Sequence, residues 1–483
     1  MIRLEDLVHD WAQDLDPKLI GLNIGNLSLD SRRIEPGDAF VALAGQQHHG
    51  LQFAGQALDS GAAVVLHDGQ TSAPDDRRFI QVHCLSSRLG DLARRCWQDP
   101  AAGLDLYAVT GTNGKSSVAW LLAQALDGGM IGTLGTGRPA NFASGTHTTP
   151  DILSLYRTLA ALKRDGIARI AIEASSHALD QQRLAGLEFD TVIFTNLGHD
   201  HLDYHGNLEN YAAAKARLFR DYSSRQQLIC VDDEFGRELA QELSGRSGLV
   251  RFGMKSSHDP DVWAEVRKAS LEGQWIDLQL PTGRLTLHSR LIGQVNLLNL
   301  MVVAAVLESR GASHQDIADI IADLEPVPGR MNPLTGPAGQ VVVVDYAHTP
   351  DALENALQSL RELISGRLIC VFGCGGERDR AKRPMMGRIA EALADRVIIT
   401  DDNPRHEDGL GIIREIQAGM VRPARSVVQR DRARAIELAI GEAAGNDVVL
   451  LAGKGHESEQ IIGDDSRTFS DLSTAQALLA EAA

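Results

Sequence analysis

The chain has 483 residues, a formal net charge of −17 and 43% hydrophobic residues. This length exceeds what a single hydrophobic core supports, so we expect about three domains. The excess of negative charge argues against a broad electrostatic surface for nucleic acid or anionic lipid, so an anionic substrate needs local positive groups. No apolar run reaches the roughly 20 residues that span a bilayer, and the N-terminus lacks a basic segment followed by an apolar one. We therefore expect a cytoplasmic globular protein without membrane insertion.

The first 90 or so residues contain short strand-like runs such as DAFVAL and AAVVLHDG, separated by turns. This pattern predicts a small α/β domain. From Leu104, the segments LYAV, TGTNGKSS and VAWLLAQAL have the character of a strand, a glycine-rich loop and a helix. That order opens a nucleotide-binding βαβ unit. The later apolar runs ARIAIEA and TVIFTNL end in polar clusters, as buried strands do when their carboxyl ends line a site.

The segment EPVPGRMNPLTGP contains four prolines and two glycines, so we expect a domain boundary near Arg330. Beyond it, VVVVDYA, RLICVFG, RVIITDD and DVVLLAG are apolar strands that alternate with helices. The predicted fold is therefore α/β with three domains: a small N-terminal domain (1–92), a central P-loop-type ATPase domain (93–330) and a C-terminal Rossmann-like domain (331–483).

The five cysteines are odd in number and form no Cys-x-x-Cys pair, so we interpret them as buried thiols. Cys370 and Cys374 flank the end of a predicted strand and could ligate a metal. Two thiols without nearby partners make a poor zinc site, however, so we prefer the interpretation as buried thiols.

The glycine-rich loop runs from Gly111 to Ser116, between a strand and a helix, so its backbone N–H groups can converge on phosphate oxygens. Lys115 would add positive charge at the β- and γ-phosphates, and Ser116 offers the hydroxyl that typically ligates magnesium. Val109 occupies the position of the first glycine in the full P-loop pattern, so the motif is a shortened form. The alternative is a glycine-rich turn with a solvated lysine.

A second cluster contains Glu173, at the end of a predicted strand, and Asp200, His201, Asp203 and His205 in the loop after the next strand. Hard oxygen ligands near a phosphate loop suit magnesium, with one histidine assisting. The alternative is a surface loop that gathers Asp and His without a ligand. Lys215 lies on an alanine-rich helix, where a lysine is usually a solvated charge.

These strings occur with others in one order along nearly the whole chain: LSLDSR, TGTNGKSS, EASSHALDQQR, TNLGHDHLDYHG, YAAAKARLF, GQVNLLN, VPGRMN, VDYAHTPDALENAL, GCGGERDRAKRP, DDNPR and GKGHE. Together they resemble the Mur ligases of bacterial cell-wall synthesis. The resemblance implies a UDP-binding, an ATPase and an amino-acid-binding domain, in that order. It also implies that ATP phosphorylates the D-glutamyl γ-carboxylate of UDP-N-acetylmuramoyl-L-alanyl-D-glutamate, and that an amine of meso-diaminopimelate then attacks the acyl phosphate.

The same resemblance implies which residues bind each substrate. The UDP end would contact Leu29, Ser31, Gln46, Gln47 and His48, and the muramyl-peptide would contact Thr148, Thr149, Ser175, Gln181 and Arg183. ATP would be bound by Gly111, Thr112, Asn113, Gly114, Lys115, Ser116 and Ser117, with Asn299, Arg330 and Asp345 approaching when the third domain closes. Mg²⁺ would be held by Ser116, Glu173, His201 and Lys215, the last as a carbamate. Lys115, Lys215 and His201 would be catalytic.

By the same resemblance, Asp402, Asn403, Pro404 and Arg405 match the family signature for diaminopimelate, and Arg378, Gly453 and Glu457 would bind its remaining groups. Arg405 can fork onto the distal carboxylate, which lysine lacks. The alternative for DDNPR is a simple turn, because Asn-Pro favours turns. Two departures from close relatives stand out: His147 replaces a frequent Asn, and Ser116-Ser117 replaces a threonine-containing pair.

Three other functions share part of this pattern. A sibling ligase would add L-lysine to the same precursor or act on a neighbouring one, and DDNPR argues against the lysine version. A P-loop kinase would stop at phosphoryl transfer, which leaves the C-terminal motifs without a role. A non-catalytic nucleotide-binding module would not need Lys115, Glu173, His201 and Lys215 together. We expect a monomeric enzyme that uses Mg²⁺ and ATP.

Overall fold

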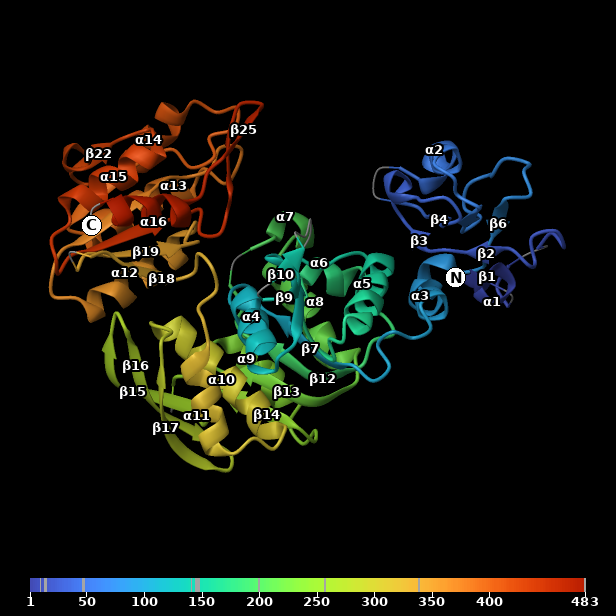
Figure 1. The fold of residues 1–483 in the computed structure, drawn as a ribbon, viewed down its shortest axis with the longest axis horizontal. Helices are drawn as coiled ribbons and strands as arrows, with labels where there is room; N and C mark the ends of the chain where they lie inside the picture. The colour runs from blue at the N-terminus through green and yellow to red at the C-terminus, as the bar shows by residue number, and fades with distance from the viewer. Residues whose placement is uncertain are drawn as a thin grey trace. The chain divides into compact units, whose positions relative to one another are not determined.

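The computed structural model describes residues 1–8, 10–12, 15–45, 48–139, 141–143, 148–198, 200–255, 258–337 and 339–481. The chain divides into two compact units, Met1–Phe252 and Gly253–Ala483. Figure 1 labels the helices and strands of both units. The α/β architecture expected from the sequence is confirmed, with parallel sheets in both units. The domain limits at residues 92 and 330 stay a prediction. Among the described residues, no helix combines the length and apolar character needed to cross a bilayer.

The first unit begins with a small four-stranded parallel sheet in the order β3-β4-β5-β6. Its strands are β3 (Leu27–Ser28), β4 (Ala39–Ala42), β5 (Val64–His67) and β6 (Phe79–Gln81). A short pair, β1 (Ile2–Arg3) and β2 (Asn23–Ile24), and the helices α1 (Leu4–Val8), α2 (Ala54–Asp59) and α3 (Leu89–Cys96) complete this part. Every residue of β4 and β5 is buried, as expected for a parallel sheet covered on both faces.

The main sheet of the first unit has eight strands in the order β10-β9-β8-β11-β7-β12-β13-β14. They are β7 (Asp105–Thr110), β8 (Gly129–Gly132), β9 (Gly135–Arg138), β10 (Asn141–Ala143), β11 (Arg169–Glu173), β12 (Phe189–Phe194), β13 (Ser224–Cys230) and β14 (Leu249–Phe252). Its helices are α4 (Lys115–Ala125), α5 (Ile152–Arg164), α6 (Ser176–Asp180), α7 (Leu202–His205), α8 (Leu208–Arg220) and α9 (Glu234–Glu242). Because β11, β7 and β12 are parallel neighbours, the polar segments that follow them leave the same edge.

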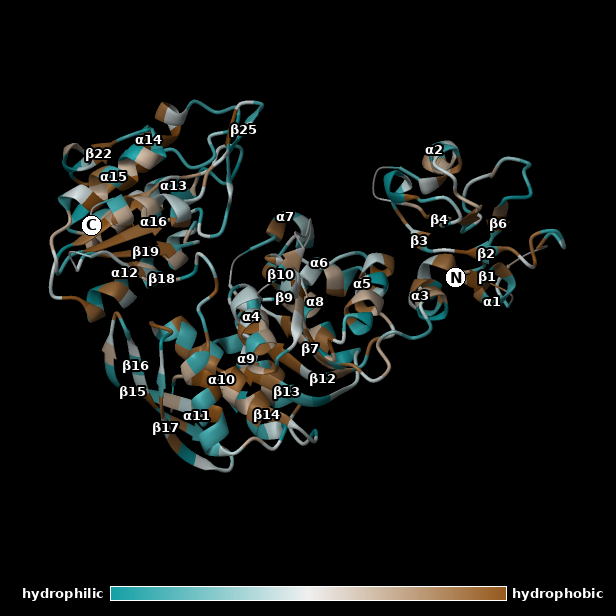
Figure 2. Cartoon of the chain, viewed as in Figure 1, coloured by the Kyte–Doolittle hydropathy of each residue, from teal (hydrophilic) through white to brown (hydrophobic). Residues whose placement is uncertain are grey.

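The second unit starts with an antiparallel sheet that the sequence analysis did not identify: β15 (Trp263–Ser270), β16 (Gly273–Leu280) and β17 (Gly283–Ser289). The helices α10 (Gln294–Ser309) and α11 (His314–Asp323) follow it. Most of α10 is buried, and its apolar residues colour it brown in Figure 2.

The six-stranded sheet of the second unit has the order β18-β19-β23-β20-β21-β22, with only the edge strand β18 antiparallel. Its strands are β18 (Asn332–Thr335), β19 (Val341–Asp345), β20 (Leu368–Phe372), β21 (Arg396–Ile399), β22 (Val427–Val428) and β23 (Val448–Ala452). Around it lie α12 (Pro350–Leu363), α13 (Lys382–Leu393), α14 (Gly409–Gln417), α15 (Arg432–Glu442), α16 (Asp471–Glu481) and the hairpin β24 (Glu459–Ile462)–β25 (Asp465–Thr468). Separate apolar clusters cover the two faces of this doubly wound sheet.

The cysteines follow the prediction with one exception. Cys96, Cys230, Cys370 and Cys374 are buried, and burial raises the pKa of the Cys370 and Cys374 thiols to about 12. Cys84 is exposed, so its interpretation as a buried thiol is wrong. It lies in a turn with a left-handed backbone (φ 53°) between β6 and α3.

Candidate active site

The glycine-rich loop joins β7 to α4, and the segment after β12 holds it by hydrogen bonds. Thr112 N–H donates to Asn196 O at 2.8 Å, and Asn113 N–H donates to the side-chain oxygen of Asn196 at 2.9 Å. Gly111 has φ 150°, and a Cβ there would collide with the Thr195 hydroxyl. Gly114 precedes α4 with φ 86°. The loop is thus fixed before a helix whose first-turn N–H groups can bind an anion.

Lys115 and Ser117 lie in the first turn of α4. The Lys115 ammonium donates to Gly111 O and Thr112 O at 2.9 and 2.8 Å, so it lies over the loop rather than extending into solvent. The Ser117 side chain is buried. The Lys115 side chain is therefore partly buried and hydrogen-bonded to its own loop, and its contact with phosphate stays a prediction.

Ser116 and Glu173 form the centre of the candidate magnesium site. Ser116 Oγ donates to Glu173 Oε2 at 3.0 Å, and the fully buried carboxylate also accepts from Thr133 N–H at 2.9 Å. Gly132 leaves the space for this carboxylate, because a Cβ there would collide with Glu173 Oε1. A hydroxyl and a carboxylate beside a phosphate loop are hard oxygen donors, so the donor set fits Mg²⁺.

Lys215 reaches this loop from α8 and is buried, contrary to the solvated charge usual on an alanine-rich helix. Its Nζ donates to Gly111 O at 2.7 Å and lies 4.2 Å from the centroid of the Tyr211 ring. Burial, followed by the charge of Lys115, holds the pKa of Lys215 well below its usual value. Burial thus shifts the protonation equilibrium of Lys215 toward the neutral, nucleophilic amine.

The loop that carries Asp200 and His201 is next to the phosphate loop. His201 has a left-handed backbone (φ 53°), is about half exposed, and has its ring centroid 4.9 Å from that of His177. Its ring also lies 6.2 Å from Tyr211, whose hydroxyl shares a 3.2 Å hydrogen bond with Thr112. His205 is buried, and its Nε2 bonds Ser176 Oγ at 3.0 Å, so it has a structural partner in α6.

The residues expected to contact the muramyl-peptide form one connected network. Thr149 Oγ1 donates to Glu173 O at 2.6 Å and accepts from Ser175 N–H at 3.1 Å. Arg183 donates to Thr149 O at 2.7 Å and to Gln181 Oε1 at 2.7 Å. Thr148 Oγ1 pairs with Thr133 Oγ1 at 2.9 Å, which links the network to the Glu173 site. His147 lies outside the described residues.

The expected UDP contacts follow two adjacent parallel strands, β3 and β4. Leu29 and Ser31 follow β3, where Ser31 is buried and bonds Gln56 Oε1 at 2.9 Å. His48 follows β4, with its ring against Phe53. Gln46 and Gln47 lie outside the described residues. The described members therefore leave the same edge of the N-terminal sheet.

The remaining residues expected to approach ATP belong to the second unit. The Asp345 carboxylate accepts from Met331 N–H and Ala347 N–H, both at 2.8 Å, and burial raises its pKa. The Arg330 guanidinium lies 5.0 Å from the centroid of the Tyr346 ring. Arg330 and Asp345 are thus together at the end of β19. Asn299 is buried on α10, where its amide bonds Asn296 at 3.3 Å.

The DDNPR and GKGHE segments meet at the carboxyl ends of β21 and β23. The buried Lys454 ammonium donates to Asn403 Oδ1 at 3.2 Å, Glu457 Oε2 at 2.9 Å and Glu459 O at 2.6 Å, which uses its three donors. Asn403 Nδ2 also donates to Glu457 Oε2 at 2.9 Å. A Cβ at Gly453 would lie 2.7 Å from Asp402 Oδ2. Asp402, Asn403, Gly453 and Glu457 are therefore brought together.

Arg405 and Arg378 flank one glycine from opposite loops. A Cβ at Gly375 would lie 3.1 Å from Arg405 Nη1 and 3.6 Å from Arg378 Cγ. Arg405 donates from Nη1 to Gly376 O at 2.8 Å and has a left-handed backbone (φ 52°). The segment Asp402–Arg405 follows β21 as a bend with Pro404 buried in it, ends in a β-bridge between Arg405 and Ile462, and brings a guanidinium to the site.

Comparisons with known proteins agree with this geometry. Family models match residues 23–97 (Mur ligase family, catalytic domain), 109–307 (Mur ligase middle domain) and 329–455 (Mur ligase, glutamate ligase domain). The UDP-N-acetylmuramoyl-L-alanyl-D-glutamate--2,6-diaminopimelate ligase of Alkalilimnicola ehrlichii is 46% identical over 502 residues, covering 100% of this chain and 99% of that one. The chain belongs to the Mur ligase family.

Other Mur ligases give the same result. The Pseudomonas aeruginosa protein with the same name is 45% identical over 469 residues, covering 95% of this chain and 96% of the relative. A solved structure of a ligase with that name superposes with a TM-score of 0.73 at 33% identity, covering 100% of this chain and 99% of that one. The ADP complex of MurF from Thermotoga maritima, 19% identical with a TM-score of 0.66 over 98% of this chain and 100% of that one, shares the fold.

Several residues of this Mur ligase site were not named from the sequence. Lys454 and His177 lie inside the quoted strings GKGHE and EASSHALDQQR, so the motifs contained a signal for both. Tyr211 likewise lies in YAAAKARLF. Thr133 belongs to none of the quoted strings, and only the fold shows its contact with Glu173.

Proposed function

We propose that this Mur ligase joins meso-2,6-diaminopimelate to UDP-N-acetylmuramoyl-L-alanyl-D-glutamate, coupled to the conversion of ATP to ADP and phosphate. The observation that carries the choice of amine is that the Arg405 guanidinium and the side-chain stem of Arg378 lie beside the same residue, Gly375. Two guanidinium groups suit a substrate with two carboxylates. The Alkalilimnicola ehrlichii ligase, whose name states these substrates, is 46% identical to this chain over nearly its full length, which supports the same substrates here. The reaction belongs to peptidoglycan precursor synthesis in the cytoplasm, and thus to cell shape and division.

The first step activates the precursor. The D-glutamyl γ-carboxylate attacks the γ-phosphorus of ATP, a P–O bond forms, the bond to the β-phosphate oxygen breaks, and ADP leaves. The N-terminus of α4 and Lys115 bind the phosphates and stabilise their charge. Mg²⁺, held by Ser116 and Glu173 with His201, would neutralise charge on the transferring phosphoryl group. Thr149 and Arg183 would orient the peptide end that is phosphorylated.

The second step forms the amide. The neutral amine of diaminopimelate attacks the acyl carbon, a C–N bond forms, the C–O bond to phosphate breaks, and the amine loses a proton. Arg405 binds the distal carboxylate, Arg378 binds the other carboxylate, and Glu457 attracts the ammonium group. These contacts place the attacking nitrogen and replace the water that the charged groups lose.

Lys215 would act as a carbamate. Its neutral amine attacks CO₂, a C–N bond forms, one C=O π bond of CO₂ opens, and one proton leaves, so a neutral amine becomes an anion with two oxygens. The low pKa of this buried amine supports the reaction, because only the unprotonated form is nucleophilic. An anionic oxygen suits Mg²⁺ better than an ammonium group does. Intact mass spectrometry under CO₂ tests this proposal: the wild type gains one CO₂ and Lys215→Met does not.

The proposed function is tested by phosphate release from ATP with Mg²⁺ and the UDP-dipeptide, comparing meso-diaminopimelate, L-lysine and no amine. Release with diaminopimelate alone, with a product heavier by that residue, supports the proposal. Phosphate release with L-lysine would identify the protein as the sibling ligase that adds lysine. Release without any amine, together with a stable phosphorylated precursor, indicates a kinase. We also propose a monomer, which light scattering after gel filtration tests.

A further inference from the structure

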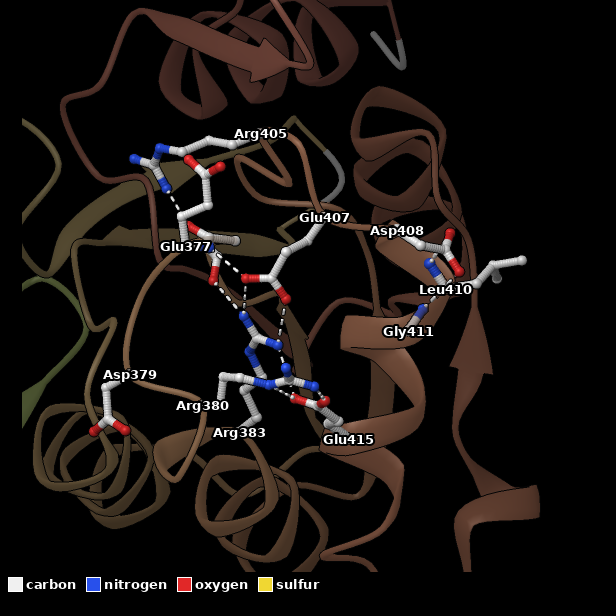
Figure 3. A network of polar contacts seen from close by, with 12 residues as sticks. Glu377, Asp379, Arg380, Arg383, Arg405, Glu407, Asp408, Leu410, Gly411 and Glu415 are labelled. Atoms are coloured by element: carbon white, nitrogen blue, oxygen red, sulfur yellow. Dashed lines mark hydrogen bonds and ion pairs between the residues drawn. The ribbon is translucent and has the colours of Figure 1, made fainter.

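Arg383, near the start of α13, is a fully buried cation with three acceptor groups around it (Figure 3). Its Nη1 donates to Glu407 Oε2 at 2.9 Å and Glu415 Oε2 at 2.7 Å. Its Nη2 donates to Glu407 Oε1 at 3.0 Å and Gly375 O at 3.1 Å. Burying a charge costs free energy unless the charge is paired and hydrogen-bonded. The Arg383 contacts meet both conditions and hold separate segments of the chain together.

Arg383 and Glu407 connect two loops, which we name the β20 loop (residues 373–381) and the β21 loop (residues 400–408). Glu407, in the β21 loop, also accepts a hydrogen bond from the N–H of Glu377 in the β20 loop. Arg383 binds the β20 loop at Gly375 O. Both carboxylate oxygens of Glu407 are therefore occupied within the protein, which argues against a direct contact with substrate.

The same two loops carry the proposed carboxylate-binding residues. Arg378 follows Glu377 directly in the β20 loop, and Arg405 lies two positions before Glu407 in the β21 loop. Gly376 N–H donates to Asn403 O at 2.9 Å, and Arg405 Nη1 donates back to Gly376 O at 2.8 Å. A Cβ at Gly376 would collide with Pro404 O. The loops are in backbone contact, so a shift of one moves the other.

Each loop also has one residue with an unfavourable backbone conformation: Glu377 in the β20 loop and Arg405 in the β21 loop. Glu377 has φ 53° and Arg405 has φ 52°, values that non-glycine residues rarely adopt. Such conformations persist where surrounding contacts determine them. The hydrogen bond from Glu377 N–H to Glu407 is such a contact. The Arg383 guanidinium lowers the pKa of Glu407 to about 2, so this carboxylate is charged throughout the neutral range.

We propose that Arg383 and Glu407 are positioning residues that set the spacing of Arg378 and Arg405, and thereby the selectivity for an amino acid with two carboxylates. This proposal rests on the proposed function. Arg383 acts through its planar fork, which binds a carboxylate with two parallel hydrogen bonds and still reaches the Gly375 carbonyl. A lysine at this position cannot make all of these contacts.

The test is steady-state kinetics of full-length Glu407→Gln and Arg383→Lys, with diaminopimelate, L-lysine, ATP and the UDP-dipeptide varied in turn. The matched control is Glu442→Gln, because Glu442 accepts two hydrogen bonds from Arg396 (3.0 and 2.9 Å) in the same unit and its own side chain is about as exposed as that of Glu407. We expect KM for diaminopimelate to rise at least about tenfold in both loop variants, since small misplacements of binding groups have such effects. KM for ATP and the UDP-dipeptide stays at the wild-type value, and the preference for diaminopimelate over lysine falls.

A purely structural role would lower the folded fraction and Vmax for all substrates and leave KM for diaminopimelate unchanged; that result overturns the proposal. If Glu407→Gln does not fold, Glu407→Asp replaces it, because it keeps the charge and shortens the reach, and its KM must still rise. If neither the wild type nor Glu442→Gln uses diaminopimelate, the proposed function is overturned, and this inference with it. Activity in both with an unchanged KM in Glu407→Gln would overturn this inference alone.

Discussion

The hydroxyl of Ser116 donates a hydrogen bond of 3.0 Å to the carboxylate of Glu173, although the two residues are 57 positions apart. Ser116 lies in the first turn of the helix after the phosphate loop, and Glu173 ends the neighbouring strand β11. Their contact places a hydroxyl and an anionic oxygen at one point beside the loop. This pair is the structural basis for the magnesium-dependent chemistry that we propose.

Glu173→Gln is expected to reduce kcat/KM at least about 100-fold, because it replaces an anionic ligand by a neutral amide of the same shape. The Mg²⁺ concentration for half-maximal rate should also rise. Phosphate release over a magnesium titration measures both effects. Glu209→Gln, an exposed position on α8, is the control and should behave as the wild type. An unchanged magnesium dependence in Glu173→Gln would refute its role as a ligand.

The lowered pKa of Lys215 predicts a specific pH dependence of the free energy of unfolding. Burial holds its folded-state pKa below the unfolded value of about 10.4, so between the two values the unfolded state binds more protons. Stability of the unmodified protein therefore rises with pH through this window, up to the unfolded pKa. In CO₂-free buffer without metal, the stability advantage of Lys215→Met should be largest below the folded pKa and shrink as pH rises. Urea denaturation of both proteins over pH measures it, and a constant difference contradicts the assignment.

Asp471→Asn should destabilise the second unit by about 3–5 kcal/mol, because it leaves the guanidinium of Arg432 buried without a counter-charge. Both side chains are fully buried, and Arg432 donates to Asp471 at 2.7 and 2.6 Å. Glu442→Gln removes the charge of a partly exposed pair and should cost less than about 1 kcal/mol. Chemical denaturation compares the two. Equal losses of stability in the two variants would show that burial of the ion pair does not decide the cost of removing its negative charge.

Arg405→Lys should raise KM for diaminopimelate by about 10- to 100-fold, since a lysine cannot fork onto a carboxylate. The rate with L-lysine as substrate should change little, because lysine offers no distal carboxylate to this side chain. Initial rates over a range of each amine give the ratio. Arg414→Lys, on the exposed side of α14, serves as control. A proportional loss with both amines would place Arg405 outside the selectivity site.

The strands that carry the phosphate loop and DDNPR could be predicted from sequence because their apolar runs are long and end in turn or polar residues. β7, β11, β12, β19, β20, β21 and β23 all occur where such runs predicted them. The antiparallel sheet β15–β17 could not be identified in the same way. Much of β15 is exposed, so it lacks a continuous apolar run.

Burial and pairing across the fold were the parts that sequence could not supply. Lys215 has the local sequence of a solvated lysine, yet it is buried and donates to the carbonyl of Gly111, which is 104 positions away. Lys454 contacts Asn403 across 51 positions, so no local pattern reveals that the Asn403 side chain holds Glu457 and Lys454 together. Such contacts depend on strand order and register, which residue patterns leave open.

The most direct test of the central claim is a competition assay with ATP, Mg²⁺, UDP-N-acetylmuramoyl-L-alanyl-D-glutamate and equal concentrations of meso-diaminopimelate and L-lysine, with the products separated by mass. We predict that the diaminopimelate product predominates in the wild type and that its excess over the lysine product falls in Arg405→Lys. Predominance of the lysine product in the wild type, or an unchanged product ratio in Arg405→Lys, would contradict the account.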